Sequence, residues 1–204
     1  MEIVGLDCYL RRGKKIPKIS WEEYKQIERK ISNKEDDYKA LIKKYKEYVK
    51  ECGTYHHWNS LLEEVGYWRK ANQIHKFFVD NVQNGTDDCD MYLVNKEDLE
   101  ELLDRVNKVL ENSELVEGKV SSGYSFEKQE DGEIIRLDHY KNGKVIKDTS
   151  VAEELLPTQC GFFFGGNEYD EYYYNDLTQT KRIIEDVLDK TDFDNEYIVY
   201  ESSW

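Results

Sequence analysis

Apolar side chains recur at three- and four-residue spacing in the first quarter of the chain, which predicts two helices there. Ser20 and Glu23 match the S-x-x-E capping box, so the first helix is expected over 20–31. The second is expected over 34–52, ending just before a glycine. Because lysines are frequent here, the two helices predict a basic helical hairpin over residues 20–52.

Helical periodicity also marks later stretches of the chain. It is strongest over 67–82, where apolar residues line one side of the predicted helix. Asn95 can cap another helix, whose buried face is expected to consist of Leu99, Leu102, Leu103, Val106 and Leu110. Further helical patterns cover 56–65, 151–156 and 176–188.

Other stretches have the short apolar patterns of β-strands, at 2–10, 91–94, 161–166 and 197–200. In the middle of the chain, Asp131-Gly132 and Asn142-Gly143 are signals for type I′ hairpin turns. They separate three strand-like stretches and predict a three-stranded meander over 119–149. The whole pattern predicts one α+β domain over residues 1–204, with a mixed or antiparallel sheet packed by about five helices. The basic hairpin and the meander would be appended elements.

The composition is that of a folded, water-soluble chain. Hydrophobic residues make up 39% of the 204 positions, too many for a disordered protein. We expect no membrane association, because the sequence lacks a run of about 18 apolar residues and its acidic start does not resemble a signal peptide. The four cysteines are widely separated, so we expect free thiols in a reducing cytoplasm. They are Cys8, Cys52, Cys89 and Cys160.

The charge is strongly negative and unevenly distributed. The net charge is −14, yet the first 50 residues hold 14 Lys/Arg and 9 Asp/Glu, a net charge of +5. The rest of the chain therefore has a net charge of −19. An acidic body disfavours direct binding to nucleic-acid phosphates, which requires cationic side chains. It is typical of a solvated surface, and it also suits a partner protein with a basic surface.

One candidate site lies in the stretch 66–75. If this stretch is helical, Trp68, Asn72 and His75 fall on one row of the helix, with Arg69 close by. Such a set could stack on a ring and hydrogen-bond its edge or a phosphate. The alternative is a helix at the margin of the core, in which His75 and Asn72 have structural hydrogen-bond partners.

A second candidate site lies at 156–176, where a glycine-flanked aromatic stretch meets a loop dense in acids and tyrosines. Its candidate ligand-binding residues are Phe164, Glu168, Tyr169, Asp170 and Tyr173. Carboxylates this close together can bind a hard cation or include one acid with a raised pKa. The alternative is a helix N-terminus whose acids suit the helix dipole, with tyrosines packing on the sheet.

Asp7 and Tyr9 complete the candidate ligand-binding residues, because they share one side of the first predicted strand. A carboxylate in the middle of a sheet requires a partner. A hydrogen bond to Arg69 or to the backbone is the expected one.

Metal-binding and catalytic patterns are incomplete in the sequence. Cys52, His56 and His57 lie close together but lack a second ligand pair at zinc spacing. The nucleophile-elbow, zinc-protease and kinase signatures are missing. A Cys–His nucleophile could only use a cysteine far from His75 in the sequence. We therefore expect no metal and no cofactor, and the sequence does not favour an enzyme.

Long motifs in these segments relate the chain to a group of phage proteins. The motifs are GLDxYL (5–10), GYWRKANQIHxF (66–77), DDC (87–89) and LLPTxxGFFFGxxEYDEYYYxDL (155–177). In them the chain resembles an uncharacterised bacteriophage and prophage accessory protein family, more weakly over 20–52 and 119–149. The resemblance implies an accessory protein in the cytoplasm of a bacterial host and supplies no reaction. Members usually have Ser in place of Cys160, which argues against that thiol as a nucleophile.

Three functions follow as hypotheses. The first is a binding protein that uses its acidic surface to inhibit a host defence or nucleic-acid-processing protein. The alternative is a protein that binds or hydrolyses a nucleotide-like small molecule at the two candidate sites. The third is a structural protein that self-associates through its tyrosine-rich loop.

Overall fold

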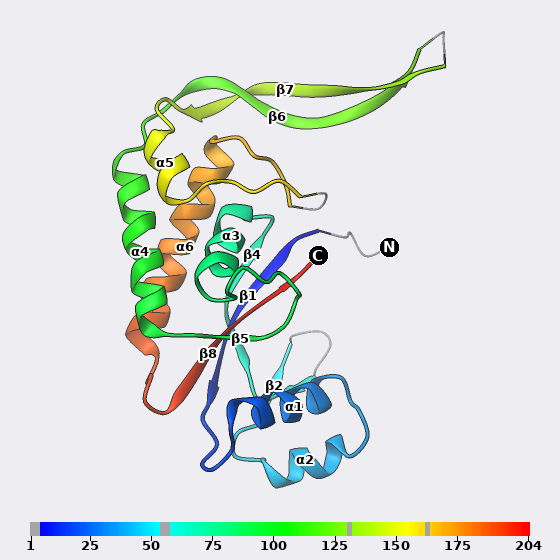
Figure 1. Ribbon diagram of the computed structural model, residues 1–204, viewed down its shortest axis with the longest axis vertical. Helices are drawn as coiled ribbons and strands as arrows, with labels where there is room; N and C mark the ends of the chain where they lie inside the picture. Colours follow the sequence, from blue (N-terminus) through cyan, green and yellow to red (C-terminus); the bar gives the residue numbers. More distant parts are fainter. Residues whose placement is uncertain (1–4, 54–57, 130–131, 162–163) are drawn as a thin grey trace.

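A four-stranded antiparallel sheet lies at the centre of the molecule (Figure 1). The computed structural model describes residues 5–53, 58–129, 132–161 and 164–204. The strand order is β4-β1-β8-β5, and the bounds are Glu63–Arg69, Asp7–Lys14, Glu196–Ser203 and Tyr92–Val94. Since β1 and β8 are neighbours, Asp7 at the start of β1 lies opposite Ser203 at the end of β8.

Three helices pack on one face of this sheet and enclose the main core. They are α3 (Asn72–Asn81), α4 (Lys96–Glu111) and α6 (Glu171–Lys190). Cys8 and Leu10 of β1 are completely buried in this core, whereas Asp7 and Tyr9 lie on the opposite, half-exposed face. Strand β4 approaches α6 so closely that a Cβ at Gly66 would lie 2.6 Å from the Cγ2 of Ile183. A glycine is therefore required where the sheet meets α6.

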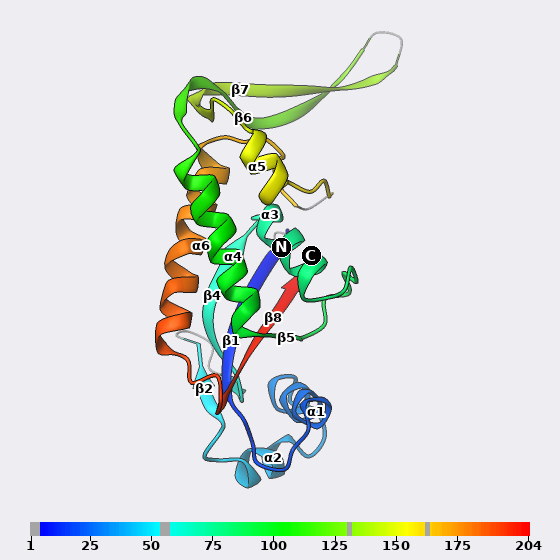
Figure 2. The ribbon, with the colours of Figure 1, turned by 60° about the vertical axis from the view of Figure 1, so that its left-hand side comes forward.

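A smaller apolar cluster forms at the far end of the sheet, around Tyr24, Ile31 and Leu61 (Figure 2). Helices α1 (Trp21–Ser32) and α2 (Tyr38–Lys44) contribute to it, and so does Val199 of β8. Leu61 follows β3 (Trp58–Ser60), a short strand that pairs with β2 (Lys50–Cys52). The capping box is confirmed, since the Ser20 hydroxyl accepts from the Glu23 amide and the Glu23 carboxylate accepts from the Ser20 amide.

A long two-stranded ribbon extends from the helical end of the body (Figures 1 and 2). It consists of β6 (Leu115–Lys128) and β7 (Ile134–Ile146), and the short helix α5 (Ser150–Leu155) follows it. The predicted meander is wrong in its strand number, because Asn142-Gly143 does not form a turn. Gly143 instead pairs with Gly118 inside the ribbon. The ribbon is anchored where the Ile146 amide donates to the Tyr169 carbonyl at 2.9 Å.

The α+β class is confirmed, with six helices and eight strands among the described residues. The helix predicted over 67–82 is wrong in its first part, because β4 continues to Arg69 before α3 begins at Asn72. Lys70 ends the strand with a left-handed φ of 62°. Pairing with β1, including Trp68 opposite Cys8, decides the outcome in favour of a strand.

Other predicted elements change in length or type. The described part of 56–65 is extended rather than helical, and His56 and His57 lie outside the described residues. The helix expected over 34–52 shrinks to α2, because Asp37 has a left-handed φ of 67° and β2 takes the end of this stretch. The described residues of 161–166 form no strand, and residues 162–163 lie outside the description.

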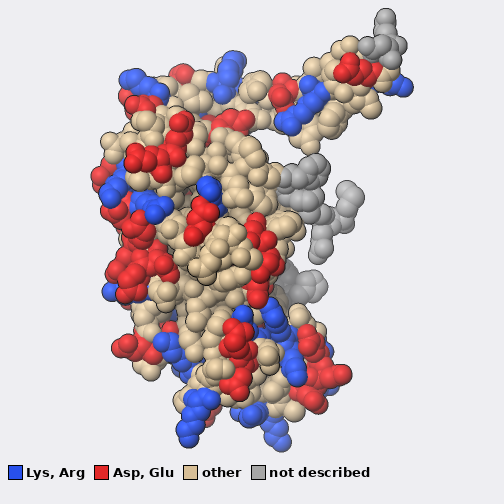
Figure 3. Space-filling view, viewed as in Figure 1, with Lys and Arg blue, Asp and Glu red and all other residues tan. Residues whose placement is uncertain are grey.

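No helix among the described residues is both long and apolar enough to cross a membrane. On the face shown in Figure 3, acidic side chains are spread over much of the surface, with Lys and Arg between them. Along α4, three ion pairs one helical turn apart partly neutralise the acids. They are Lys96–Glu100, Arg105–Glu101 and Lys108–Asp104.

Candidate functional site

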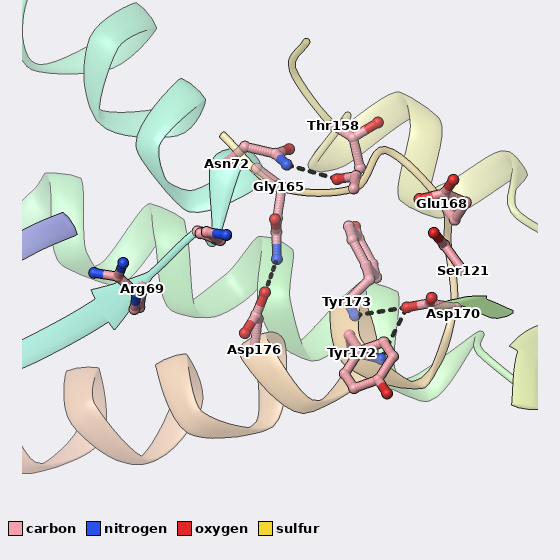
Figure 4. Close-up of a pocket in the computed structure, with 13 residues that line it drawn as sticks. Arg69, Asn72, Ser121, Thr158, Gly165, Glu168, Asp170, Tyr172, Tyr173 and Asp176 are labelled. Carbon is pink, nitrogen blue, oxygen red and sulfur yellow. Dashed lines mark hydrogen bonds between the residues drawn. The ribbon is translucent and has the colours of Figure 1, made fainter. Parts of the chain in front are cut away.

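A pocket of about 330 Å³ opens where β4 passes into α3, beside the first turns of α6 (Figure 4). Five parts of the chain form its wall. Its polar and charged lining residues are Arg69, Lys70, Asn72, Gln73, Ser121, Thr158, Glu168, Asp170, Tyr172, Tyr173 and Asp176. The pocket thus combines the first and second candidate segments of the sequence.

Two cations stand at one end of the pocket. Arg69 is held by Asp7, whose carboxylate oxygens both lie 2.7 Å from Nη1. Arg69 is the partner predicted for Asp7, and the Tyr67 hydroxyl also donates to the same carboxylate. Asp7 raises the pKa of Arg69 through this hydrogen bond, which keeps the guanidinium charged. The exposed side chain of Lys70 follows directly in the chain.

Asn72 builds the wall of the pocket rather than projecting into open space. Its side chain is 1% exposed. The amide nitrogen donates to the carbonyls of Phe164 and Gly166, at 3.2 and 2.8 Å, and the amide oxygen accepts from the Gln159 N–H at 2.8 Å. The carbonyls of Phe164 and Gly166, in the described part of 161–166, are thus bound by a side chain from α3 rather than by a neighbouring strand.

The floor of the pocket contains a carboxyl–carboxamide pair. Gln73 of α3 donates from Nε2 to Asp176 of α6 at 3.1 Å. Burial raises the pKa of Asp176 to about 6, although the bond from Gln73 lowers it. Near neutral pH this carboxyl can therefore exchange a proton or accept one from a bound molecule.

Asp170 and its neighbours close the opposite end. Asp170 is the N-cap of α6, and its carboxylate accepts from the amides of Tyr172 and Tyr173 at 2.9 and 3.2 Å. Burial nevertheless raises the pKa of Asp170. In Figure 4, Glu168 and Ser121 lie beside Asp170, far from Arg69. The helix N-terminus foreseen as the alternative for this loop is therefore what forms here.

His75 lies outside the pocket, in the core. It is completely buried, with Nδ1 2.8 Å from the Tyr200 hydroxyl and Nε2 3.0 Å from the Asp87 carboxylate. Asp87 in turn accepts from the indole of Trp204 at 3.0 Å. The His75 ring also meets Phe164 edge to face, 5.2 Å between centroids. Both ring nitrogens are thus satisfied structurally, which is the arrangement foreseen as the alternative for this helix.

The remaining candidates have packing roles in the structure. Trp68 is 1% exposed and donates from Nε1 to the Thr180 hydroxyl at 2.9 Å. Tyr9 lies on the half-exposed sheet face, 5.4 Å from the ring of Tyr67. Tyr169 and Tyr173 pack edge to face, 4.9 Å between centroids. None of these residues lines the pocket except Tyr173.

Several lining residues were not singled out by the sequence. Lys70, Gln73 and Thr158 lie within the long motifs but were not among the candidate ligand-binding residues, and Ser121 lies outside the motifs. Asp176 ends the second candidate segment but was not among its candidate ligand-binding residues, and only its burial distinguishes it from the other acids. Among the described residues, no group of three or more His, Cys, Asp or Glu is arranged to hold a metal ion. Burial raises the pKa of the Cys8 thiol to about 12, so this cysteine is a poor nucleophile.

Comparison of the chain with models of protein families, with curated proteins and with solved structures returns no match.

Proposed function

We propose that the protein binds a small, nucleotide-like molecule, a ring with an anionic group, in the pocket between β4, α3 and α6. The observation that carries the proposal is the separation of chemistries in one cavity of about 330 Å³. Arg69 and Lys70 stand at one end, and the Gln73–Asp176 pair lies in the floor. The volume is at the lower end of the usual range for small-molecule sites.

Each part of the ligand has a matching group. Arg69, oriented by Asp7, and Lys70 suit a phosphate or carboxylate. Asp176 accepts from a ring N–H or amino group when ionised, and donates when protonated. Tyr172, whose side chain is 48% exposed, offers an aromatic face at the other side of the pocket.

A thermal-shift screen against nucleosides, nucleotides and inorganic phosphate tests the proposal, because a ligand that binds only the folded chain raises its melting temperature. Lys70→Asn removes one cation and suits the left-handed backbone at this position. Lys76→Asn is the matched control, because Lys76 is on α3 outside the pocket, paired with Asp80. We expect a shift with a nucleotide that Lys70→Asn weakens and the control retains. The absence of any shift across the screen would remove the proposal.

A second proposal concerns the acidic surface. The net charge of −14 and the resemblance to phage accessory proteins support an inhibitor of a host protein with a basic surface, in the bacterial cytoplasm. The ion pairs along α4 weaken it, because they reduce the field that a basic partner would meet. A stoichiometric complex with a basic host protein, disrupted by salt, is the expected result, and a complex indifferent to salt would contradict it.

A further inference from the structure

The ribbon formed by β6 and β7 exposes large apolar side chains to solvent. Tyr124, Phe126, Ile134 and Tyr140 are 54%, 66%, 66% and 58% exposed. The outer part of the ribbon stands clear of the body in both views (Figures 1 and 2). Among the described residues no third strand joins it. An isolated two-stranded ribbon is at best marginally stable in water, so this part of the chain lacks a covering partner.

These side chains lie on one face of the ribbon. Tyr124 pairs with Asp138, and Phe126 with Arg136, so each pair points to the same side. Ile134 and Tyr140 share that side, because they alternate with Arg136 and Asp138 along β7. We call this surface the arm face, defined by Tyr124, Phe126, Ile134, Arg136, Asp138 and Tyr140.

Several side chains of the arm face contact one another. The rings of Tyr124 and Phe126 meet edge to face at 5.4 Å. The Arg136 guanidinium lies 4.4 Å from the Tyr124 ring centroid and pairs with Asp138 at 2.7 Å. Arg136 and Asp138 flank this aromatic strip, and Lys128, opposite Ile134, adds a second cation on the same side. The strip therefore has both signs of charge that a copy of itself requires. Such self-complementarity is the property of surfaces that meet across a two-fold axis.

We propose that the arm face is a self-association surface, through which two copies of this chain pack their ribbons face to face. From the exposed fractions and the size of such side chains, each copy would bury about 500 Å². The total of about 1,000 Å² is near the lower limit for a specific interface. A weak, concentration-dependent dimer is therefore expected.

Charge favours a second copy over other occupants. Residues 115–146 hold six Asp/Glu and five Lys/Arg, a net charge of −1, so the rest of the chain has a net charge of −13. Contact through the ribbons keeps two acidic bodies apart, whereas most other contacts would bring them together. Nucleic acid is repelled by the same charge. A basic protein would be attracted to the acidic body rather than to this nearly neutral ribbon.

Sedimentation equilibrium of the full chain, in reducing buffer and over a wide concentration range, tests the proposal. The test variant is Phe126→Ser, and the control is Leu137→Ser, on the opposite face of the same ribbon and 37% exposed. We expect the wild-type chain to dimerise, with a dissociation constant raised about tenfold or more by Phe126→Ser and little changed by the control. Added salt is expected to strengthen the dimer, because it screens repulsion between the bodies.

Three results would overturn the proposal. The wild-type chain could remain a monomer at the highest concentration reached. Phe126→Ser could dimerise as tightly as wild type while melting at the same temperature. Salt could weaken the dimer, which would place the contact between the acidic body and the basic hairpin instead.

Discussion

The side chain of Asn72 at the start of α3 accepts a hydrogen bond from the backbone N–H of Gln159, 87 positions further along the chain, at 2.8 Å. The same side chain donates to the carbonyls of Phe164 and Gly166. One amide therefore uses its oxygen and its nitrogen to fix both arms of the loop that walls the pocket. The conformation of this loop therefore depends on the Asn72 side chain of α3, and substituting Asn72 tests that dependence.

Asn72→Ala is expected to destabilise the fold by about 2–4 kcal/mol, because it leaves backbone groups without their buried partner. Urea unfolding measures the loss. Asn81→Ala, near the end of the same helix, removes a bond to the Phe77 carbonyl at an exposed position and is expected to cost at most about 0.5 kcal/mol. Equal unfolding midpoints for Asn72→Ala and wild type would contradict the anchoring role.

Asp176 is expected to make stability depend on pH. Its pKa rises from 3.8 in the unfolded chain to about 6 in the fold, so the folded state binds this proton more tightly. The stabilisation is complete below pH 3.8 and is lost as the pH rises through about 6. Asp176→Asn removes the ionisation, and a gain of about 1 kcal/mol over wild type is expected at pH 8, fading towards pH 4.

Urea unfolding at several pH values measures this difference. Asp186→Asn is the control, because Asp186 is on the same helix, 54% exposed and paired with Lys190. It should show no comparable gain at high pH. If Asp176→Asn tracks wild type at every pH, the carboxyl is not desolvated as described.

The hydrogen-bonded series Tyr200–His75–Asp87 is expected to stabilise the core. Tyr200→Phe removes the hydroxyl 2.8 Å from the His75 Nδ1 and leaves a buried ring nitrogen unpaired. A loss of about 1–2 kcal/mol is expected. Thermal and urea unfolding measure this loss. Tyr174→Phe is the control, because Tyr174 is a half-buried tyrosine on α6, and its stability should change by at most about 0.5 kcal/mol. Similar losses of stability for both variants would argue against a contribution from this hydrogen-bonded series.

Glu28 is expected to respond differently to two substitutions. It is 2% exposed and accepts from the Ser60 hydroxyl and the Leu61 amide, each at 2.6 Å, while burial raises its pKa. Glu28→Ala should cost about 2–3 kcal/mol, because it leaves these donors unpaired. Glu28→Gln keeps an acceptor and removes a buried charge, so it should cost less, most visibly at high pH.

The same urea series checks both substitutions. Glu22→Ala, at a position 71% exposed on the same helix, is the control and should change stability by at most about 0.5 kcal/mol. If the alanine and glutamine variants of Glu28 lose the same stability, the two hydrogen bonds contribute nothing measurable.

Local sequence determined the elements whose signals are complete within one segment. The Ser20–Glu23 capping box places the start of α1, and Asn95 with the apolar spacing that follows places α4. The hairpin signal Asp131-Gly132 falls in the sequence between β6, which ends at Lys128, and β7, which begins at Ile134. In each case the hydrogen-bonding groups or the apolar stripe lie within a few residues, so no distant contact is required to decide the structure.

Tertiary structure decided the segments with ambiguous patterns and nearly all of the site. The stretch 63–69 becomes a strand because β1 pairs with it, which no local period reveals. Asp176 is one of many acids in the sequence. Only the tertiary structure places it against Gln73, 103 positions away, and buries it, and burial is what raises its pKa. The sequence thus determined which residue types were available, while the packing of distant elements decided which became wall, floor or core, because burial and pairing are properties of the whole fold.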